Sequence, residues 1–190
     1  MMSEVGARCT VLLVGLLLVG CAGSSKSVEV AYDRASGQTT YETREMRIED
    51  IQMTSGLQQR NRFYVQILGT CTGDDCVPSQ YSMRFIKEGP QAVTVEGRDV
   101  TLTIGSETLR WEDAQTRDAG QTATIRSGVF AKVSLSSKQL STIGGGSSMR
   151  GTVCGERFTL PYRTRSPIRS LLTRVEQGGT EASDNASGET

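Results

Sequence analysis

The 190-residue chain contains no histidine. Neutral imidazole is the usual base of Ser-His-Asp and Cys-His nucleophiles and a principal protein ligand of zinc, copper and iron. The sequence therefore excludes these schemes. It also lacks a phosphate loop, a dinucleotide fingerprint and a G-x-S-x-G elbow. We accordingly assign no catalytic residue, metal ligand or cofactor, and predict that the protein is not an enzyme.

An excess of positive charge is also missing. Lys+Arg and Asp+Glu both number 21, which gives a formal net charge of zero. Nucleic-acid binding normally requires a basic face that displaces counterions, so we expect no nucleic-acid partner. A hydrophobic content of 36% and a charged content of 22% are typical of a soluble globular domain.

The one long apolar run lies near the amino terminus, from Thr10 to Gly20. It is too short for the about 20 residues that cross a bilayer, but it fits the hydrophobic region of an export signal. The segment Leu18-Val19-Gly20-Cys21 resembles the lipobox of bacterial lipoproteins. This resemblance implies cleavage before Cys21, a diacylglyceryl group on its thiol and acylation of the new amino terminus. The alternative is a buried apolar helix that ends in a cysteine.

The same resemblance indicates where the protein is held. Ala22 follows the lipidated cysteine, whereas an Asp at that position often signals retention in the inner membrane of Gram-negative bacteria. We therefore expect a lipid-anchored protein of the bacterial cell envelope, at the outer membrane. The membrane is its first predicted partner, and two or three acyl chains hold a protein stably.

The chain divides into four segments by composition. Residues 1–20 form the predicted signal peptide, and residues 21–27 form the lipidated cysteine with a small-residue linker that reaches about 13 Å by random-coil scaling. Residues 28–176 form a β-rich globular domain that ends in a helix over 167–177. Residues 178–190 lack large apolar side chains and read as a disordered tail.

Two-residue alternation of apolar side chains predicts many short strands. It is visible in VEVAY from Val28, RFYVQIL from Arg62, YSMRF from Tyr81, DVTLTIG from Asp99 and the run GVFAKVSL, with Gly128 as the expected bulge. The segments around GTVC and RFTLPY suggest a last hairpin. The fold class is mainly β, an antiparallel β-sandwich or barrel-like sheet with a C-terminal α-helix packed on it.

Two helices are expected. SSKQLSTI, from Ser136, predicts a short one. In the C-terminal helix Ser166 is the expected cap, Pro167 the first helical residue and Gly178 the end. The residues that form its apolar stripe are Ile168, Leu171, Leu172 and Val175.

Three cysteines remain after Cys9 and Cys21 are set aside. In an oxidising compartment CTGDDC favours a local disulfide between Cys71 and Cys76. Cys154 then reads as a small buried hydrophobe, and the alternative is a long bridge from it to Cys71 or Cys76. Zinc ligation is disfavoured because tight cysteine spacing with a second pair is missing, and a redox role because the spacing is not C-x-x-C. Asp74 and Asp75 favour a solvated turn over a calcium site.

Five arginines fall close together near the carboxyl terminus: Arg157, Arg163, Arg165, Arg169 and Arg174. They are a candidate patch for anionic ligands such as lipid head groups or lipopolysaccharide phosphates, and the alternative is an ordinary solvated face. The leading functional hypothesis is a non-catalytic binding or structural module with an envelope protein or glycan as its partner. A carboxylate-dependent hydrolase of envelope polymers is the third hypothesis.

Overall fold

The computed structural model describes residues 26–52, 61–90, 92–112, 114–116, 122–125 and 127–186. The predicted signal peptide, Cys21 and the last four residues of the expected tail lie outside this part of the chain. Within it, the predicted fold class is confirmed, because the protein consists mainly of antiparallel β-sheet with a C-terminal helix. The sheets do not close into a barrel.

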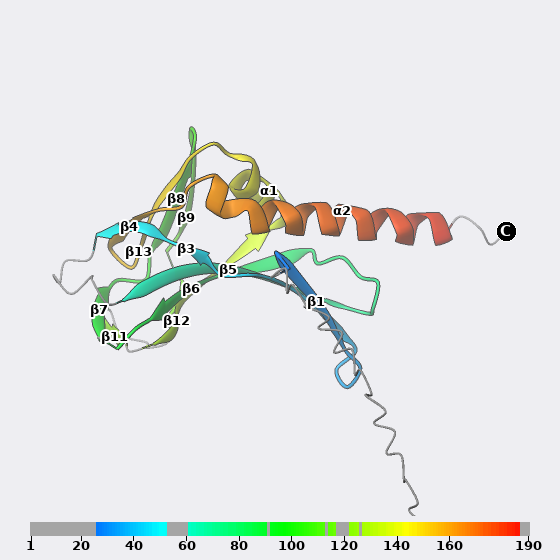
Figure 1. Cartoon of the computed structure of the whole chain (residues 1–190), viewed down its shortest axis with the longest axis horizontal. Coiled ribbons are helices and arrows are strands. Elements are labelled where there is room, and N and C mark those ends of the chain that lie inside the picture. Colours follow the sequence, from blue (N-terminus) through cyan, green and yellow to red (C-terminus); the bar gives the residue numbers. More distant parts are fainter. Residues whose placement is uncertain are drawn as a thin grey trace, which may run out of the picture.

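Most strands belong to two sheets, which we call the large and the small sheet (Figure 1). In the large sheet the order is β1-β2-β5-β6-β12-β10, and β3 also pairs with β5; in the small sheet it is β4-β14-β13-β8-β9. The large sheet comprises β1 (Val28–Asp33), β2 (Gln38–Thr43), β3 (Met46–Arg47), β5 (Arg62–Thr72), β6 (Gln80–Glu88), β10 (Gln115–Thr116) and β12 (Gly128–Ser136). The small sheet comprises β4 (Glu49–Gln52), β8 (Val100–Ile104), β9 (Glu107–Trp111), β13 (Met149–Val153) and β14 (Glu156–Thr159). A separate pair is formed by β7 (Val93–Glu96) and β11 (Thr122–Ile125).

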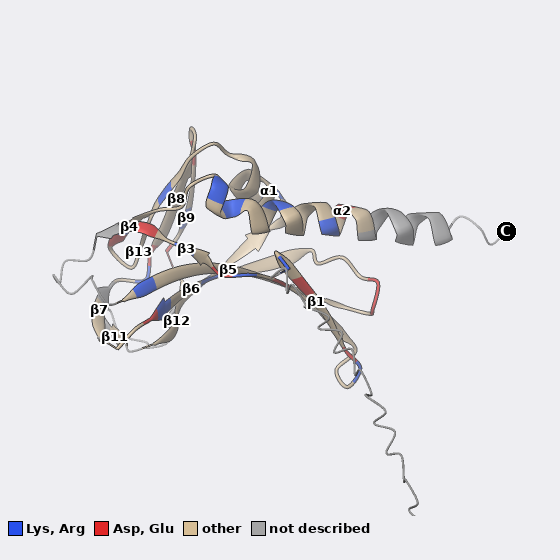
Figure 2. Cartoon of the chain, in the orientation of Figure 1, with Lys and Arg blue, Asp and Glu red and all other residues tan. Residues whose placement is uncertain are grey.

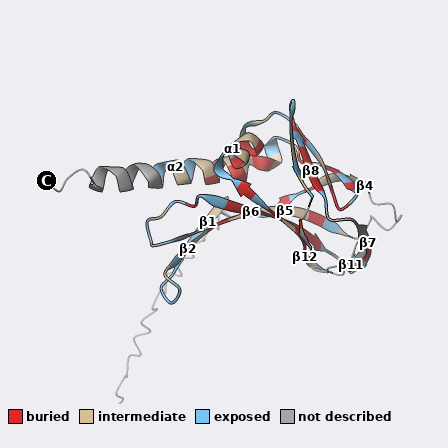
Figure 3. Ribbon diagram, turned by 180° about the vertical axis from the view of Figure 1, so that it is seen from behind, coloured by how far each residue is buried: buried red, intermediate tan, exposed pale blue. Residues whose placement is uncertain are grey.

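The core lies between the two sheets and follows the predicted alternation. Phe63, Val65 and Ile67 on β5 are buried, and each lies opposite a residue of β6 on the same face. The rings of Phe85, on β6, and Phe158, on β14, meet edge to face across the core at 5.6 Å. Figure 3 shows that buried residues concentrate where the sheets face each other. This two-layer arrangement is sandwich-like.

The bulge in β12 lies two residues further on than predicted. The pairing of β12 with β6 shifts between Val129 and Ala131, and not at Gly128. Phe130 is therefore buried, whereas Val129 is only half-buried and lies opposite Ile86. The extra residue turns Phe130 towards Phe63, with which it makes an edge-to-face contact at 6.1 Å.

The exposure of β1 is a feature that the alternation of its residues did not predict. Val28, Val30 and Tyr32 do share the core-side face, as predicted, because Val30 pairs with the buried Tyr41 and Tyr32 with the buried Thr39. However, Val30 is 39% and Tyr32 45% exposed. The reason is position, since β1 is an edge strand at the end of the large sheet that extends beyond the small sheet (Figure 1).

The helices lie side by side on the core side of the large sheet. The first, α1 (Ser137–Gly145), was predicted, and Ser136 caps it in a reciprocal capping box with Gln139. The second, α2 (Ser166–Ala186), packs on α1 and also contacts β1 and β2. Its apolar stripe is as predicted: Ile168 and Leu171 are buried, and Leu172 and Val175 pack partly against the core.

Both ends of α2 differ from the prediction. Ser166 is already helical and does not cap, because the 3₁₀ turn η2 (Arg163–Arg165) runs directly into α2. At the other end α2 continues past Gly178 to Ala186, so the first part of the predicted disordered tail is helical. A glycine costs about 1 kcal/mol in a helix interior, which penalises the helix without forcing it to stop.

Candidate functional site

The start of β1 shows how few residues separate the folded domain from Cys21, the predicted point of attachment. Cys21 lies outside the described residues, but Val28, seven residues later, already opens β1. Because β1 contacts α2, the chain enters the fold beneath that helix. This β1–β2 end of the large sheet, where the described chain begins, is our candidate functional site.

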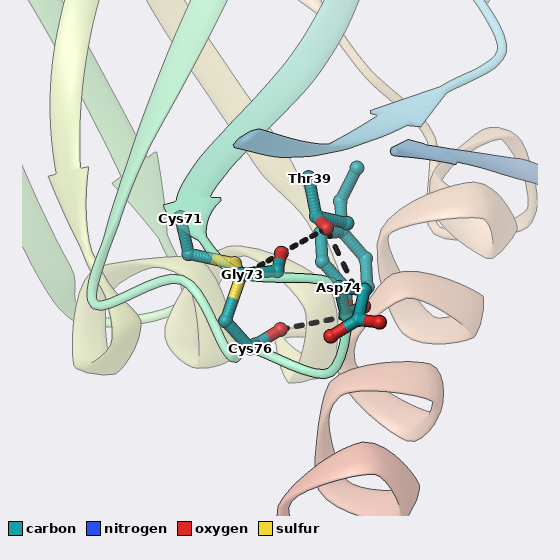
Figure 4. Close-up of a disulfide and its surroundings, with 6 residues drawn as sticks. Thr39, Cys71, Gly73, Asp74 and Cys76 are labelled. Carbon is teal, nitrogen blue, oxygen red and sulfur yellow. Dashed lines mark hydrogen bonds between the residues drawn. A yellow bond between two sulfur atoms is a disulfide. The ribbon is translucent and has the colours of Figure 1, made fainter. Parts of the chain in front are cut away.

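A disulfide closes the loop beside that end. Cys71 and Cys76 are bonded, with their Cα atoms 5.8 Å apart, so the predicted local pair is confirmed. The Thr39 hydroxyl donates to the carbonyl of Gly73, and the Tyr41 hydroxyl donates to the carbonyl of Cys76 at 2.8 Å (Figure 4). We call residues 71–77 the disulfide loop; two side chains of β2 hold it against the sheet.

Next to this loop the surface is apolar. Four large hydrophobic side chains of the described residues are exposed, and three of them, Val30, Tyr32 and Val77, lie at this end of the sheet. Val77 follows Cys76, whose main-chain carbonyl accepts the hydrogen bond from the Tyr41 hydroxyl, and Tyr41 is the cross-strand partner of Val30. We call these three side chains the apolar strip. The sequence pattern placed Val30 and Tyr32 on one face but did not reveal that this face is uncovered.

The acidic pair of the disulfide loop, Asp74 and Asp75, lies at the tip of the loop and is exposed. The main-chain carbonyl of Asp74 accepts a hydrogen bond from the Thr39 hydroxyl at 3.4 Å. In the part of the chain that the structure describes, no three Cys, Asp or Glu side chains are grouped so that they could hold a metal ion.

The five arginines do not form one surface patch, which corrects part of the predicted site. Arg165 is completely buried, and its guanidinium donates to the carbonyl oxygens of Ile143 and Gly146, at the end of α1. Burial lowers the pKa of Arg165, and the neighbouring Arg169 lowers it further. This side chain joins η2, the turn that leads into α2, to the end of α1, and it is not available to a ligand.

The other four arginines differ in their contacts. Arg169 stacks on the ring of Tyr162, 3.9 Å from its centroid, and donates to the Tyr162 carbonyl. Arg163 lies 3.9 Å from the Glu49 carboxylate. Arg157, on β14, and Arg174, on α2, are exposed. Figure 2 shows the basic residues of η2 and α2 spread along these elements.

Cys154 is buried, as predicted, and is not bonded to another cysteine. It forms the two-residue turn between β13 and β14 with Gly155, and both have positive φ, 51° and 83°. Burial, together with the charge of Asp99, raises the pKa of the Cys154 thiol to about 11. The thiol is therefore protonated at neutral pH, which makes it a packing residue and not a nucleophile.

Comparison with known proteins identified no relationship: no protein-family model matches the chain, and neither do any curated protein or solved structure. Among the described residues, no helix combines the length and the apolar character needed to cross a bilayer.

Proposed function

We propose that this chain is a lipid-anchored protein of the bacterial cell envelope that acts as a non-catalytic binding module, with Cys21 as its point of attachment. The observation that carries the proposal is the segment Leu18-Val19-Gly20-Cys21, in which Cys21 directly follows an apolar run of 11 residues, Thr10 to Gly20. The predicted outer-membrane location follows from Ala22.

The short distance between Cys21 and β1 supports this proposal. Six residues separate Cys21 from Val28. A linker of this length has a root-mean-square reach of about 13 Å, so the β1–β2 end of the large sheet stays close to the bilayer. The apolar strip at that end offers a binding surface near the membrane, for an envelope protein or glycan.

The non-catalytic part of the proposal rests on the side chains available. The chain has no histidine, and Cys154, the one thiol of the folded body that is not in a disulfide, is buried with a raised pKa. The anionic-lipid hypothesis is weakened because Arg165 is buried and Arg169 stacks on Tyr162, so the five arginines do not act as one patch.

The attachment can be tested with two matched cysteine variants of the full chain in a Gram-negative host. Cys21→Ser should abolish incorporation of a labelled fatty acid and leave the signal peptide uncleaved. Cys9→Ser should behave as the wild type, because this cysteine would be removed with the signal peptide. Mass spectrometry of the mature amino terminus is the second readout. A mature chain that begins elsewhere than at Cys21, or that carries no acyl group, would refute the proposal.

A further inference from the structure

The edge of β1 differs from the other outer edges of the large and the small sheet, which are β10, β4 and β9. An exposed strand edge offers unpaired backbone groups to another chain, and proteins normally protect it with short strands, bulges or inward-facing charges. β10 has only two residues, and the pairing of β4 with β14 has a register shift. On β9, Glu107 lies opposite the buried Ile104 and so is a charge on the core-side face.

None of these protections is present on β1. It pairs with β2 through six consecutive residues without a shift. The strand contains no proline, lysine or arginine, and its two acidic residues, Glu29 and Asp33, lie on the face away from the core. The core-side face carries Val28, Val30 and Tyr32, of which the last two are exposed. Such an edge is suited to pairing with a further strand.

We propose that β1 pairs with β1 of a second copy of this chain, so that the two large sheets form one continuous antiparallel sheet. In such a pair a two-fold axis runs perpendicular to the sheet, and residues directly opposite each other lie on the same face. Only a few registers are available, and their charges distinguish them.

The register centred on Val30 is the favourable one. It places Val30 opposite Val30, Val28 opposite Tyr32 and Glu29 opposite Ala31. Aromatic and β-branched residues are favourable cross-strand partners. A register centred on Ala31 sets Glu29 against Asp33, and one centred on Glu29 sets two glutamates against each other; like charges directly opposite are destabilising. Of these three registers, only the one centred on Val30 opposes no like charges, and it pairs Val28, Val30 and Tyr32 with one another.

The surroundings of β1 fit this pairing. Val28 is half-buried and packs against the core, and α2 passes over β1. The partner's Tyr32, placed opposite Val28, lies on the core-side face of the sheet, the face on which α2 packs. Val30 and Tyr32, the two exposed apolar side chains of this face, thereby gain cross-strand partners. A two-fold axis along the membrane normal leaves both linkers free to reach the same bilayer.

Cysteine crosslinking of the full chain in intact cells tests the register. Directly opposite residues of antiparallel strands have Cα atoms about 4.5 to 5.5 Å apart, within the range of a disulfide. Upon mild oxidation Val30→Cys should form a covalent dimer at least tenfold more efficiently than Ala31→Cys, its matched control. Val28→Cys and Tyr32→Cys should each crosslink weakly alone but efficiently when differently tagged copies are expressed together.

Three outcomes would overturn the proposal: no dimer at any position, a stronger dimer with Ala31→Cys than with Val30→Cys, or Val30→Cys adducts mainly with a different protein. The last result would mean that another protein supplies the strand. The pairing does not depend on lipidation, so the same order of efficiencies is expected in the Cys21→Ser background. Failure of the anchor and failure of the strand pairing are therefore distinguished.

Discussion

The buried guanidinium of Arg165 donates a hydrogen bond to the main-chain carbonyl of Ile143, in the last turn of α1. It donates a second one to the carbonyl of Gly146, just beyond that helix. The last carbonyls of a helix have no partner within it, and a buried carbonyl without a partner is costly. Arg165, in η2, therefore supplies hydrogen-bond donors to the carbonyls at the end of α1. This contact also fixes where α2 begins.

Replacement of Arg165 should destabilise the protein strongly. We expect Arg165→Met to lower the free energy of unfolding by about 2 to 4 kcal/mol, because two carbonyls lose their donor inside the protein. Arg174→Met, on the exposed side of α2, should change it by less than about 0.5 kcal/mol. Urea unfolding of the full chain in mild detergent, followed by fluorescence of Trp111, measures both. Equal effects would show that Arg165 has no special role.

Two adjacent glycines of α1 give opposite predictions. A Cβ at Gly144 would lie 2.8 Å from Leu172 Cδ1 on α2 and 3.3 Å from Ile168 Cγ2, whereas a Cβ at Gly145 meets nothing within 4 Å. Gly144→Ala should thus destabilise by about 1 to 3 kcal/mol through overpacking, and Gly145→Ala should stabilise by up to about 1 kcal/mol. Thermal unfolding of the two variants gives the signs. If both variants are stabilised, α1 and α2 do not pack as closely as the structure shows.

The disulfide loop should contribute to stability through its covalent bond and through its contact with β2. Cys71→Ser combined with Cys76→Ser should cost about 2 kcal/mol in the chain-entropy model. Tyr41→Phe, which removes the hydrogen bond to Cys76, should cost about 0.5 to 1.5 kcal/mol.

The two effects should be coupled, since the bond holds the acceptor in place. Tyr41→Phe should therefore cost less in the chain without the disulfide. Tyr32→Phe is the control, because this tyrosine is 45% exposed and lies on β1, whereas the side chains that donate to the disulfide loop are Thr39 and Tyr41 of β2. Strict additivity in the double-mutant cycle would argue against the coupling.

Cys154 should make stability depend on pH in alkaline solution. Its pKa rises from 9.0 to about 11 on folding. The unfolded thiol thus loses its proton first, and the stability present below pH 9 declines as the pH rises through about 11. The loss should amount to about 1 to 3 kcal/mol.

Comparison with Cys154→Ala isolates this effect from other groups, such as Tyr81, whose pKa burial also raises. The difference in stability between the wild type and Cys154→Ala should shrink between pH 8.5 and 11, measured as urea midpoints. Native Cys154 should also react with a maleimide only after unfolding. A pH-independent difference, or rapid reaction of the folded protein, would contradict the raised pKa.

Much of the fold could be predicted from local pattern. Phe63, Val65 and Ile67 alternate with polar residues, and a strand with one buried face requires this period. The local disulfide and the stripe of Ile168 and Leu171 on α2 were predicted for similar reasons: the spacing along the chain already limits which side chains meet. The bulge in β12 was misplaced because it depends on pairing with β6.

The candidate site could be predicted less well from the sequence pattern. Arg165 and Arg169 look equivalent in the sequence, yet one is buried under α1 and the other stacks on Tyr162. Val30 has the same local pattern as Val65, but Val65 is fully buried and Val30 is not. Which arginine reaches a helix end, and which strand lies at a sheet edge, depends on the order of strands and on helix packing.

The sequence by itself thus determined the β class, the strand periodicity and the local disulfide, because each depends on neighbours within a few residues. Only the tertiary structure decided that Arg165 belongs to the interior and that β1 forms an open edge with Val30 and Tyr32 exposed. These features arise from contacts between distant segments, and a chain pattern carries no information on which segments lie at the end of a sheet.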